Sequence, residues 1–212
     1  MEEILKLLKA AGFEPINSAC GGITIGADYD CENPITPGVN TRLILGNLDD
    51  IEAVTYGATT PTVIEDITMK LGKAAFVFQG VRQSLTPSYE LVPGTTSVGY
   101  MHLVNFLGFE ISQEAKDNYE KMALSKMFAV VENRNAIGNG NSIFEVYGIN
   151  VGLEAQVISR VAADQETGGA FTLNLATSEA DGKEPKLPQS WFKTSYPVTL
   201  ALVNALLIPA TP

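Results

Sequence analysis

The chain has 212 residues, of which 45% are hydrophobic and 18% are charged, and its net charge is −10. This acidic balance, without any run of Lys and Arg, argues against binding to a phosphate backbone. The charged fraction lies below the roughly 25% of ordinary soluble domains, so we expect some apolar surface to be buried between subunits. Its cysteines, Cys20 and Cys31, are too few for a disulfide framework or a four-cysteine zinc site, and they either pair or remain free thiols.

Neither end of the chain has the sequence of a membrane segment. The most apolar run, residues 198–208, is shorter than the roughly 20 apolar residues that span a bilayer. Residues 1–11 begin with acidic side chains and lack the basic and long apolar regions of a secretory signal. These features predict no membrane partner, and a reducing cytoplasm is the expected place of synthesis.

The N-terminal part predicts a short helix followed by an arm. Residues 2–11 carry Ile4, Leu5, Leu7 and Leu8 on one side, which is typical of an amphipathic helix. Residues 13–40 are rich in Gly, Pro, Asn and Asp and show little periodicity. A segment of this length without repeating structure tends to be functional or to reach onto a partner, so we expect an extended arm or loop here.

The middle of the chain reads as a series of strands. Residues 42–45 and 51–56 predict a hairpin across residues 46–50, and residues 62–69, 73–81 and 87–92 predict further strands. Residues 96–111 are apolar on both faces, with Tyr100, Val104 and Phe106 on one and Met101, Leu103 and Leu107 on the other. Because such a strand must be covered on both sides, either a helix or a neighbouring subunit is expected to cover the second face.

The second half predicts one helix and then a sheet. Residues 112–127 place Ala115, Tyr119, Met122 and Ala123 on one helix face, with Ser112 as the N-cap. Strands are expected at residues 127–132, 143–147, 151–157 and 170–176, with hairpin turns at 133–142 and 164–169. Residues 177–212 read as a C-terminal extension that ends in a helix over residues 197–207.

Together these elements predict a single mainly β (α+β) domain over residues 1–212. We expect an antiparallel β-sandwich or barrel with one flanking helix, and short helices near the N- and C-termini.

The sequence contains no credible catalytic constellation. His102, the only histidine, lies between Met101 and Leu103 in a strand and is interpreted as structural. The string DYDCEN imitates the start of a calcium loop, but Asn33 and Val39 stand where an EF-hand needs Gly and Glu. A looser oxygen-ligand site in the arm, or a solvated acidic loop, both remain open. We therefore predict a non-enzymatic protein without cofactor or metal.

Several stretches carry a resemblance to a known family. The segments FEVYGINVGL (residues 144–153) and GGAFTLNL (residues 168–175), preceded by a helix and a strand, resemble the second half of phage tail tube proteins. Residues 33–56, which include GNLDDIEAVTY, and KLPQSWFKTSYPVTLALVNALL (residues 186–207) are similar to virion proteins of gut Bacteroidetes phages. The resemblance covers roughly two-thirds of the chain.

This resemblance implies subunits that form stacked, hexameric rings, with DNA passing through the lumen without specific binding. It implies that the protein is located in the virion after assembly in the bacterial host cytoplasm, with copies of itself and other virion proteins as partners. Lumen carboxylates would repel phosphates, and the candidates are Glu65, Asp66, Glu145 and Glu154. By position, residues 26–40 would form the loop that contacts adjacent subunits. The candidate inter-subunit residues are Asp28, Asp30, Glu32, Pro34, Tyr100, Leu103 and Phe106.

The N-terminal helix and the C-terminal segment are not parts of the minimal tube fold. Two alternatives therefore stay open: another capsid or head-tail connector component, and a β-sandwich module that binds carbohydrate or protein.

Overall fold

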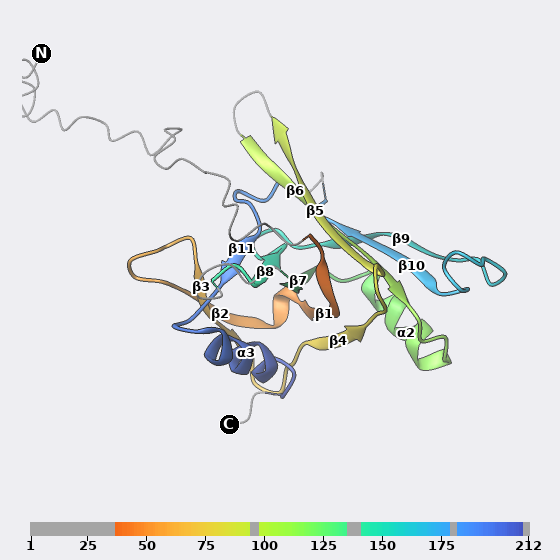
Figure 1. Cartoon of the computed structure of the whole chain (residues 1–212), viewed down its shortest axis with the longest axis horizontal. Coiled ribbons are helices and arrows are strands. Elements are labelled where there is room, and N and C mark those ends of the chain that lie inside the picture. The colour runs from red at the N-terminus through yellow and green to blue at the C-terminus, as the bar shows by residue number, and fades with distance from the viewer. Residues whose placement is uncertain (1–36, 94–97, 135–140, 179–181, 210–212) are drawn as a thin grey trace, which may run out of the picture. The chain divides into compact units, whose positions relative to one another are not determined.

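The computed structural model describes residues 37–93, 98–134, 141–178 and 182–209 (Figure 1). The chain divides into two units, Met1–Pro34 and Ile35–Pro212. The first unit lies outside the described residues, and so do the predicted helix at residues 2–11 and both cysteines. The described residues are 47% strand and 14% helix and form two sheets and two α-helices, which confirms the predicted mainly β, sandwich-like α+β fold.

The described strands and helices follow one another through the second unit. The chain forms β1 (Val39–Asn47), a short 3-10 helix η1 (Leu48–Asp50), β2 (Ile51–Tyr56), β3 (Ile64–Met69), β4 (Phe76–Gln79), β5 (Leu85–Pro93), β6 (Val98–Gly108), α2 (Gln113–Met122), β7 (Met127–Asn133), β8 (Phe144–Tyr147), β9 (Glu154–Arg160), β10 (Phe171–Ala176), β11 (Gln189–Trp191) and α3 (Tyr196–Ala205). The first strand thus takes in residues 39 and 40 of the expected arm.

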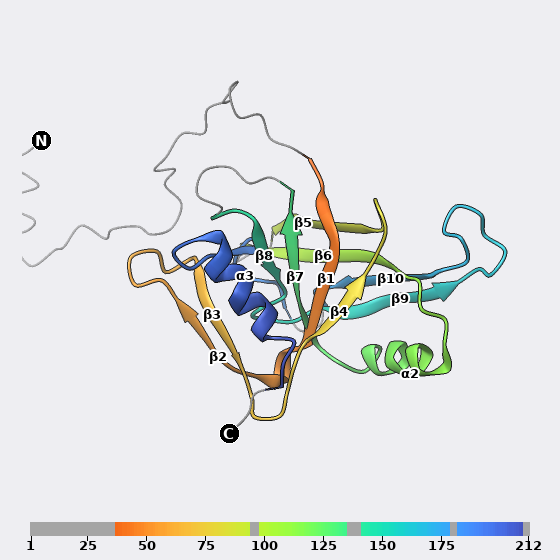
Figure 2. The same ribbon diagram turned by 60° about the horizontal axis from the view of Figure 1, so that its bottom comes forward.

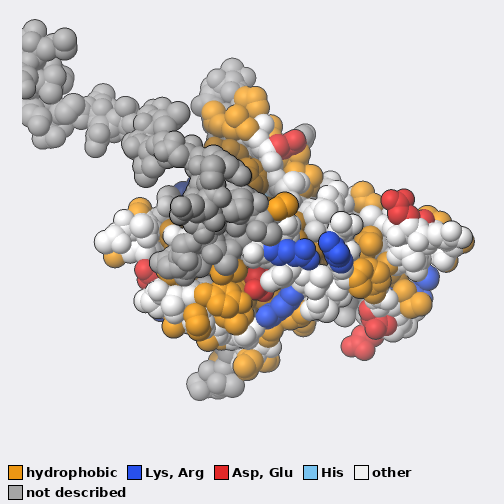
Figure 3. Space-filling model, in the orientation of Figure 1, with side chains coloured by type: hydrophobic (Ala, Val, Ile, Leu, Met, Phe, Trp, Pro, Cys, Tyr) orange, Lys and Arg blue, Asp and Glu red, His pale blue; other side chains and the backbone are white. Residues whose placement is uncertain are grey.

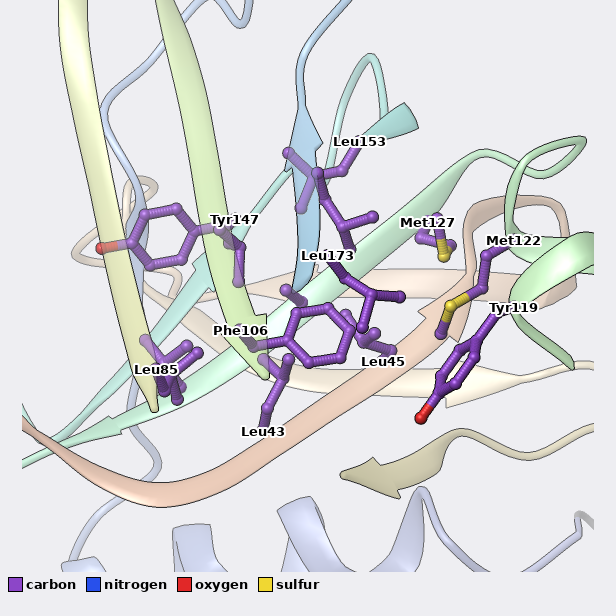
Figure 4. Close-up of a cluster of buried hydrophobic side chains, with 14 of the residues drawn as sticks. Leu43, Leu45, Leu85, Phe106, Tyr119, Met122, Met127, Tyr147, Leu153 and Leu173 are labelled. Atoms are coloured by element: carbon purple, nitrogen blue, oxygen red, sulfur yellow. The ribbon is translucent and has the colours of Figure 1, made fainter. Parts of the chain in front are cut away.

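The strands form two sheets that pack face to face. The order in the seven-stranded sheet is β2-β3-β11-β8-β7-β1-β4, and in the four-stranded sheet it is β5-β6-β10-β9. Neighbours are antiparallel, as predicted, except that β11 runs parallel to β3. Leucine and aromatic side chains of both sheets meet in the core between them (Figure 4). This core contains most of the apolar residues for which the sequence predicts strand alternation, such as Leu173 and Leu175 of β10.

The predicted hairpin between residues 42–45 and 51–56 is wrong. β1 pairs with β7 and β4, whereas β2 pairs with β3 at the other end of the same sheet. The backbone N–H of Leu48 donates to Lys126 O at 2.9 Å, which turns the chain away from β1. Leu43, Ile44 and Leu45 are all buried, and a strand that is buried on both faces belongs in the middle of a sheet.

Helix α2 forms as its sequence predicts. Ser112 is the N-cap, and its hydroxyl accepts a hydrogen bond from the backbone N–H of Ala115. Ala115, Tyr119 and Met122 form the buried face. These side chains close one end of the core between the two sheets, where Tyr119 and Met122 lie beside Met127 and Leu45 (Figure 4).

The C-terminal segment belongs to the fold instead of extending it. β11 inserts between β3 and β8, and α3 covers the face of the seven-stranded sheet that points away from the four-stranded sheet (Figure 2). Trp191 is fully buried there, and its indole N–H donates to Glu65 O at 3.2 Å. A three-residue strand is too short to show a period, which explains why the sequence did not reveal it.

Replacing Trp191 with alanine tests this placement. Because the indole is buried between β3, β8 and α3, we expect Trp191→Ala to lower the free energy of unfolding by about 3–5 kcal/mol. Urea denaturation followed by circular dichroism measures the change. Leu124→Ala, at a residue that is 92% exposed, serves as the control and should cost at most about 0.5 kcal/mol. Equal costs for the two variants would show that residues 189–205 do not contribute to the core.

Candidate assembly surfaces

The outer part of the β5–β6 hairpin extends beyond the rest of its sheet. β5 pairs with β6 from Leu85↔Phe106 to Pro93↔Val98, whereas β10 pairs with β6 only from Gly108 to Leu103. We call the projecting part, residues 89–93 and 98–100, the hairpin arm; it is visible above the other strands in Figure 1. The arm is held from one side, since the Lys183 amine donates to Val92 O at 3.0 Å.

One face of the hairpin arm is apolar and uncovered. Directly paired residues share a face of a sheet, so the core-facing side of β6, with Val104 and Phe106, continues outward to Tyr100 and Val98. Tyr89, Leu91 and Val98 are 51%, 57% and 62% exposed on this side. Hydrophobic side chains accordingly gather on the arm in Figure 3.

A groove lies at the opposite end of β6. It has a volume of about 850 Å³ and runs between the edge strand β4, residues 107–110 and helix α2. β4 pairs with β1 on one side and with no other strand among the described residues. Phe76 of β4 and Phe109 are 61% and 41% exposed at the mouth of the groove. The groove therefore lies outside the end of the core that α2 closes, and Phe76 and Phe109 are the exposed apolar side chains of its walls.

The sequence predicts that β6 is apolar on both faces. One of these faces points into the core, and the other belongs to the outer face of the four-stranded sheet. The register places Leu103, Asn105 and Leu107 of β6 on this face, and all three are half-buried. The buried residues of α2 lie in the core between the sheets, and those of α3 lie on the other sheet. Neither described helix therefore covers this face.

The predicted inter-subunit residues separate into three groups. Tyr100 lies on the hairpin arm and Leu103 on the outer face of the four-stranded sheet, and both are half-buried. Phe106 is 4% exposed and packs edge-to-face on Phe78 with ring centroids 5.4 Å apart, so the interpretation of Phe106 as an inter-subunit residue is wrong. Its side chain points into the core between the sheets. The rest of the set, namely Asp28, Asp30, Glu32 and Pro34, lies outside the described residues.

The predicted lumen carboxylates do not form one surface. The register places Glu65, Asp66 and Glu145 on the face of the seven-stranded sheet opposite α3. Glu145 accepts a hydrogen bond from the Tyr147 hydroxyl at 3.0 Å. Glu154 belongs to the four-stranded sheet and lies 4.0 Å from the Lys126 amine. The expectation that these four acids share a lumen is thus not supported by their placement in two different sheets.

A buried polar network lies behind the hairpin arm, and the sequence did not predict it. Glu184 is fully buried, and its carboxylate accepts three hydrogen bonds: from the backbone N–H groups of Asn150 and Val151 at 3.1 and 2.8 Å, and from the Asn150 side chain at 2.7 Å. Its backbone pairs with Tyr100 of β6. A single Glu in a polar loop is ordinarily expected to be exposed to solvent, so no pattern in the sequence could identify Glu184 as buried.

His102 belongs to the same region and has a structural role, as predicted. The imidazole is buried, its Nδ1 accepts a hydrogen bond from the Gly148 N–H at 3.1 Å, and its Nε2 lies 3.0 Å from Lys186 O. Accepting at Nδ1 and donating at Nε2 requires the neutral ring. Burial lowers the pKa of His102 below its ordinary value of 6.5, although the nearby Glu184 acts in the opposite direction.

The described residues contain no group of three or more His, Cys, Asp or Glu side chains that could hold a metal ion. Among the same residues, no helix is long and apolar enough to cross a membrane. Comparisons with protein-family models, curated proteins and solved structures find no match to the chain.

Because His102 is the only histidine, its titration should dominate the pH dependence of stability near neutral pH. The unfolded chain takes up a proton near pH 6.5, while the folded chain, with its lowered pKa, does so only at lower pH. The contribution of neutral His102 to the free energy of unfolding is therefore complete above pH 6.5, and it decreases as the pH falls below that value. We expect a slope of up to about 1.4 kcal/mol per pH unit below that value.

Urea denaturation at pH values between about 5.5 and 7.5, at one protein concentration, measures this slope. His102→Gln, which does not titrate, is the control and should lose most of the slope in this range. An unchanged slope in His102→Gln would assign the pH dependence to other groups.

Proposed function

We propose that the chain is a non-enzymatic virion structural protein that assembles with copies of itself into the stacked rings of a phage tail tube, through which DNA passes. The observation that carries this proposal is the uncovered apolar face of the hairpin arm, formed by Tyr89, Leu91 and Val98. The resemblance of residues 132–175 to tail tube proteins and the two-sheet fold also support it. The ring is proposed to be hexameric by the same resemblance.

Burial of these surfaces provides a driving force for assembly. A Leu, Val or Phe side chain gains about 1.5–3 kcal/mol when it is fully removed from water. The arm and the groove together expose Tyr89, Leu91, Val98, Phe76 and Phe109 on a single subunit. Exposed apolar surfaces of this kind are typical of protein–protein contacts, and their number favours contacts with more than one neighbour.

The outer face of the four-stranded sheet is the surface that we assign to the DNA channel. The described strand residues on this face include the carboxylates of Glu90 and Glu154 and the amides of Asn105 and Asn174, but no Lys or Arg. DNA binding depends on neutralisation of phosphates by Lys and Arg. The amines of Lys126 and Lys183 lie at this face, beside Glu154 and the Val92 carbonyl. A channel wall whose cations already have partners in the subunit would let DNA slide without specific binding.

Electron microscopy of the purified full-length chain tests the assembly. We expect rings or tubes with a central channel in negative stain, and a mass in light scattering that is several times that of the 22.7 kDa chain. The fraction assembled should rise with protein concentration, because the apolar surfaces are buried only in contacts between subunits. A stable monomer at high concentration would contradict the proposal.

Added lysines test which face lines the channel. Thr86→Lys with Asn174→Lys places two cations on the outer face of the four-stranded sheet, on either side of Asn105 in one cross-strand row. Tubes assembled from this variant in cells should retain nucleic acid that is protected from added nuclease. The retained amount should fall steeply with salt, because binding to phosphates releases counterions.

The matched control has the same added charge on the other sheet. Thr55→Lys with Thr68→Lys places two cations beside Asp66 on the face of the seven-stranded sheet opposite α3. Tubes of this control should carry no protected nucleic acid. Protection in the control and not in the first variant would place the channel on the seven-stranded sheet.

A further inference from the structure

We infer that the hairpin arm of one copy docks into the groove between β4 and α2 of the next copy. This inference rests on the proposed function, because it assumes self-assembly, and it adds the pair of surfaces that meet. The sequence alone assigned subunit contacts to residues 26–40, to Phe106 and to strand faces. It did not identify the groove, which is built from elements far apart in the chain.

The groove lies directly on the core, and its floor is itself almost inaccessible to solvent. Its floor includes Leu45, Tyr119 and Met122, which also belong to the core between the two sheets. Its charged side chains, Glu110, Glu114 and Lys121, come from the turn before α2 and from the exposed side of the helix. An uncharged segment with large side chains can therefore fill the groove without burying a charge against the apolar floor.

β4 is the least protected edge of either sheet among the described strands. Natural edge strands are usually blunted by charges, prolines or bulges. The edge strand β2 carries Glu52 and has two register shifts with β3, and β9 carries Glu154 and Arg160 and has a register shift with β10. β4, with the sequence FVFQ, has none of these features. Its backbone is therefore available to pair with an incoming strand.

The hairpin arm has the properties that this groove requires. The side chains on its apolar face are uncharged: Tyr89, Leu91 and Pro93 from β5, and Val98 and Tyr100 from β6. β5 pairs only with β6 among the described strands, so its other edge is free. Pro87 and Pro93 lack an N–H and confine any further pairing to residues 88–92. This window is about as long as the four-residue β4, which would limit slippage of the register.

The positions of the two surfaces set the geometry of the contact. β6 begins at Val98 on the hairpin arm and ends at Gly108 on the wall of the groove. Figures 1 and 2 both show the arm and α2 at opposite ends of this strand. Its 11 residues span about 35 Å at roughly 3.3 Å per residue. A shift of one copy along β6 therefore brings its arm to the groove of the next, as a head-to-tail contact that can repeat.

Two substitutions at exposed residues test the contact from both sides. Leu91→Lys alters the arm and leaves the groove intact, whereas Phe76→Lys alters the groove and leaves the arm intact. Each lysine would bring a charge against an apolar surface in the contact: Leu91→Lys against the floor of the groove, and Phe76→Lys against the apolar face of the arm. We expect each variant to need at least a tenfold higher concentration for assembly, or about 1.4 kcal/mol per contact. Val161→Lys is the matched control, since Val161 is 65% exposed in the turn between β9 and β10, and it should assemble like the unmodified chain.

Mixing the two variants distinguishes this contact from any symmetric one. The intact arm of Phe76→Lys fits the intact groove of Leu91→Lys, but the reverse pair cannot form. In a 1:1 mixture, we therefore expect a species with twice the mass of the species that each variant forms alone, and no larger species. Sedimentation velocity measures these masses. If the mixture stays at the mass of the separate variants, or if either variant alone assembles like the unmodified chain, the inference is overturned.

The controls separate this inference from the proposed function. If the unmodified chain and Val161→Lys assemble, but the mixing result fails, the chain is self-assembling through other surfaces. If the unmodified chain does not assemble at all, both proposals fail. Circular dichroism and urea midpoints verify that the variants are folded. Tyr89→Gln and Phe109→Gln provide a second arm and groove pair, with the same expected mixing result, if either lysine variant does not fold.

Discussion

The fold depends on covering the seven-stranded sheet from both sides. Residues 43–46 of β1 and 127–131 of β7 are buried, with Leu43, Phe128 and Val131 close to fully inaccessible. The four-stranded sheet covers one face and α3 covers the other. The four-stranded sheet does not end where the core ends, because β5 and β6 continue outward past β10. The same strand that completes the core therefore carries an apolar face into solvent at one end and reaches an open groove at the other.

The buried polar groups give the arm a fixed base. Glu184 pairs through its backbone with Tyr100 and through its carboxylate with the loop that precedes β9. Lys183 binds the carbonyl of Val92 near the tip, and His102 links β6 to Gly148. A surface that is ordered before it meets its partner loses less conformational entropy on association. The network thus orders the arm in the free subunit, and in the proposed contact it would reduce the entropy lost on association.

Local signals in the sequence predicted those elements whose structure is decided locally. The spacing of Ala115, Tyr119 and Met122 and the capping residue Ser112 define α2 without help from the rest of the chain. The pairing of β1 is different, because the choice between β2 and β7 as its neighbour depends on which strand can bury Leu43 and Leu45. The two-sided apolar pattern of β6 was visible, but whether Phe106 or Leu103 faces the core depends on where the other sheet lies. Glu184 and β11 have no periodic pattern, so only the tertiary structure identifies their partners.

A contact between the two ends of one strand gives an assembly a direction. Because the arm and the groove are different surfaces, the contact has no two-fold symmetry, and each copy in a series points the same way. One end of such an assembly exposes only arms, and the other exposes only grooves. The arms present Pro93 and the apolar side chains of β5 and β6, while the grooves offer the unprotected edge of β4. In the proposed assembly, a protein that binds the ends needs a different surface at each end: a groove for the arms, or a strand with one uncharged face for β4.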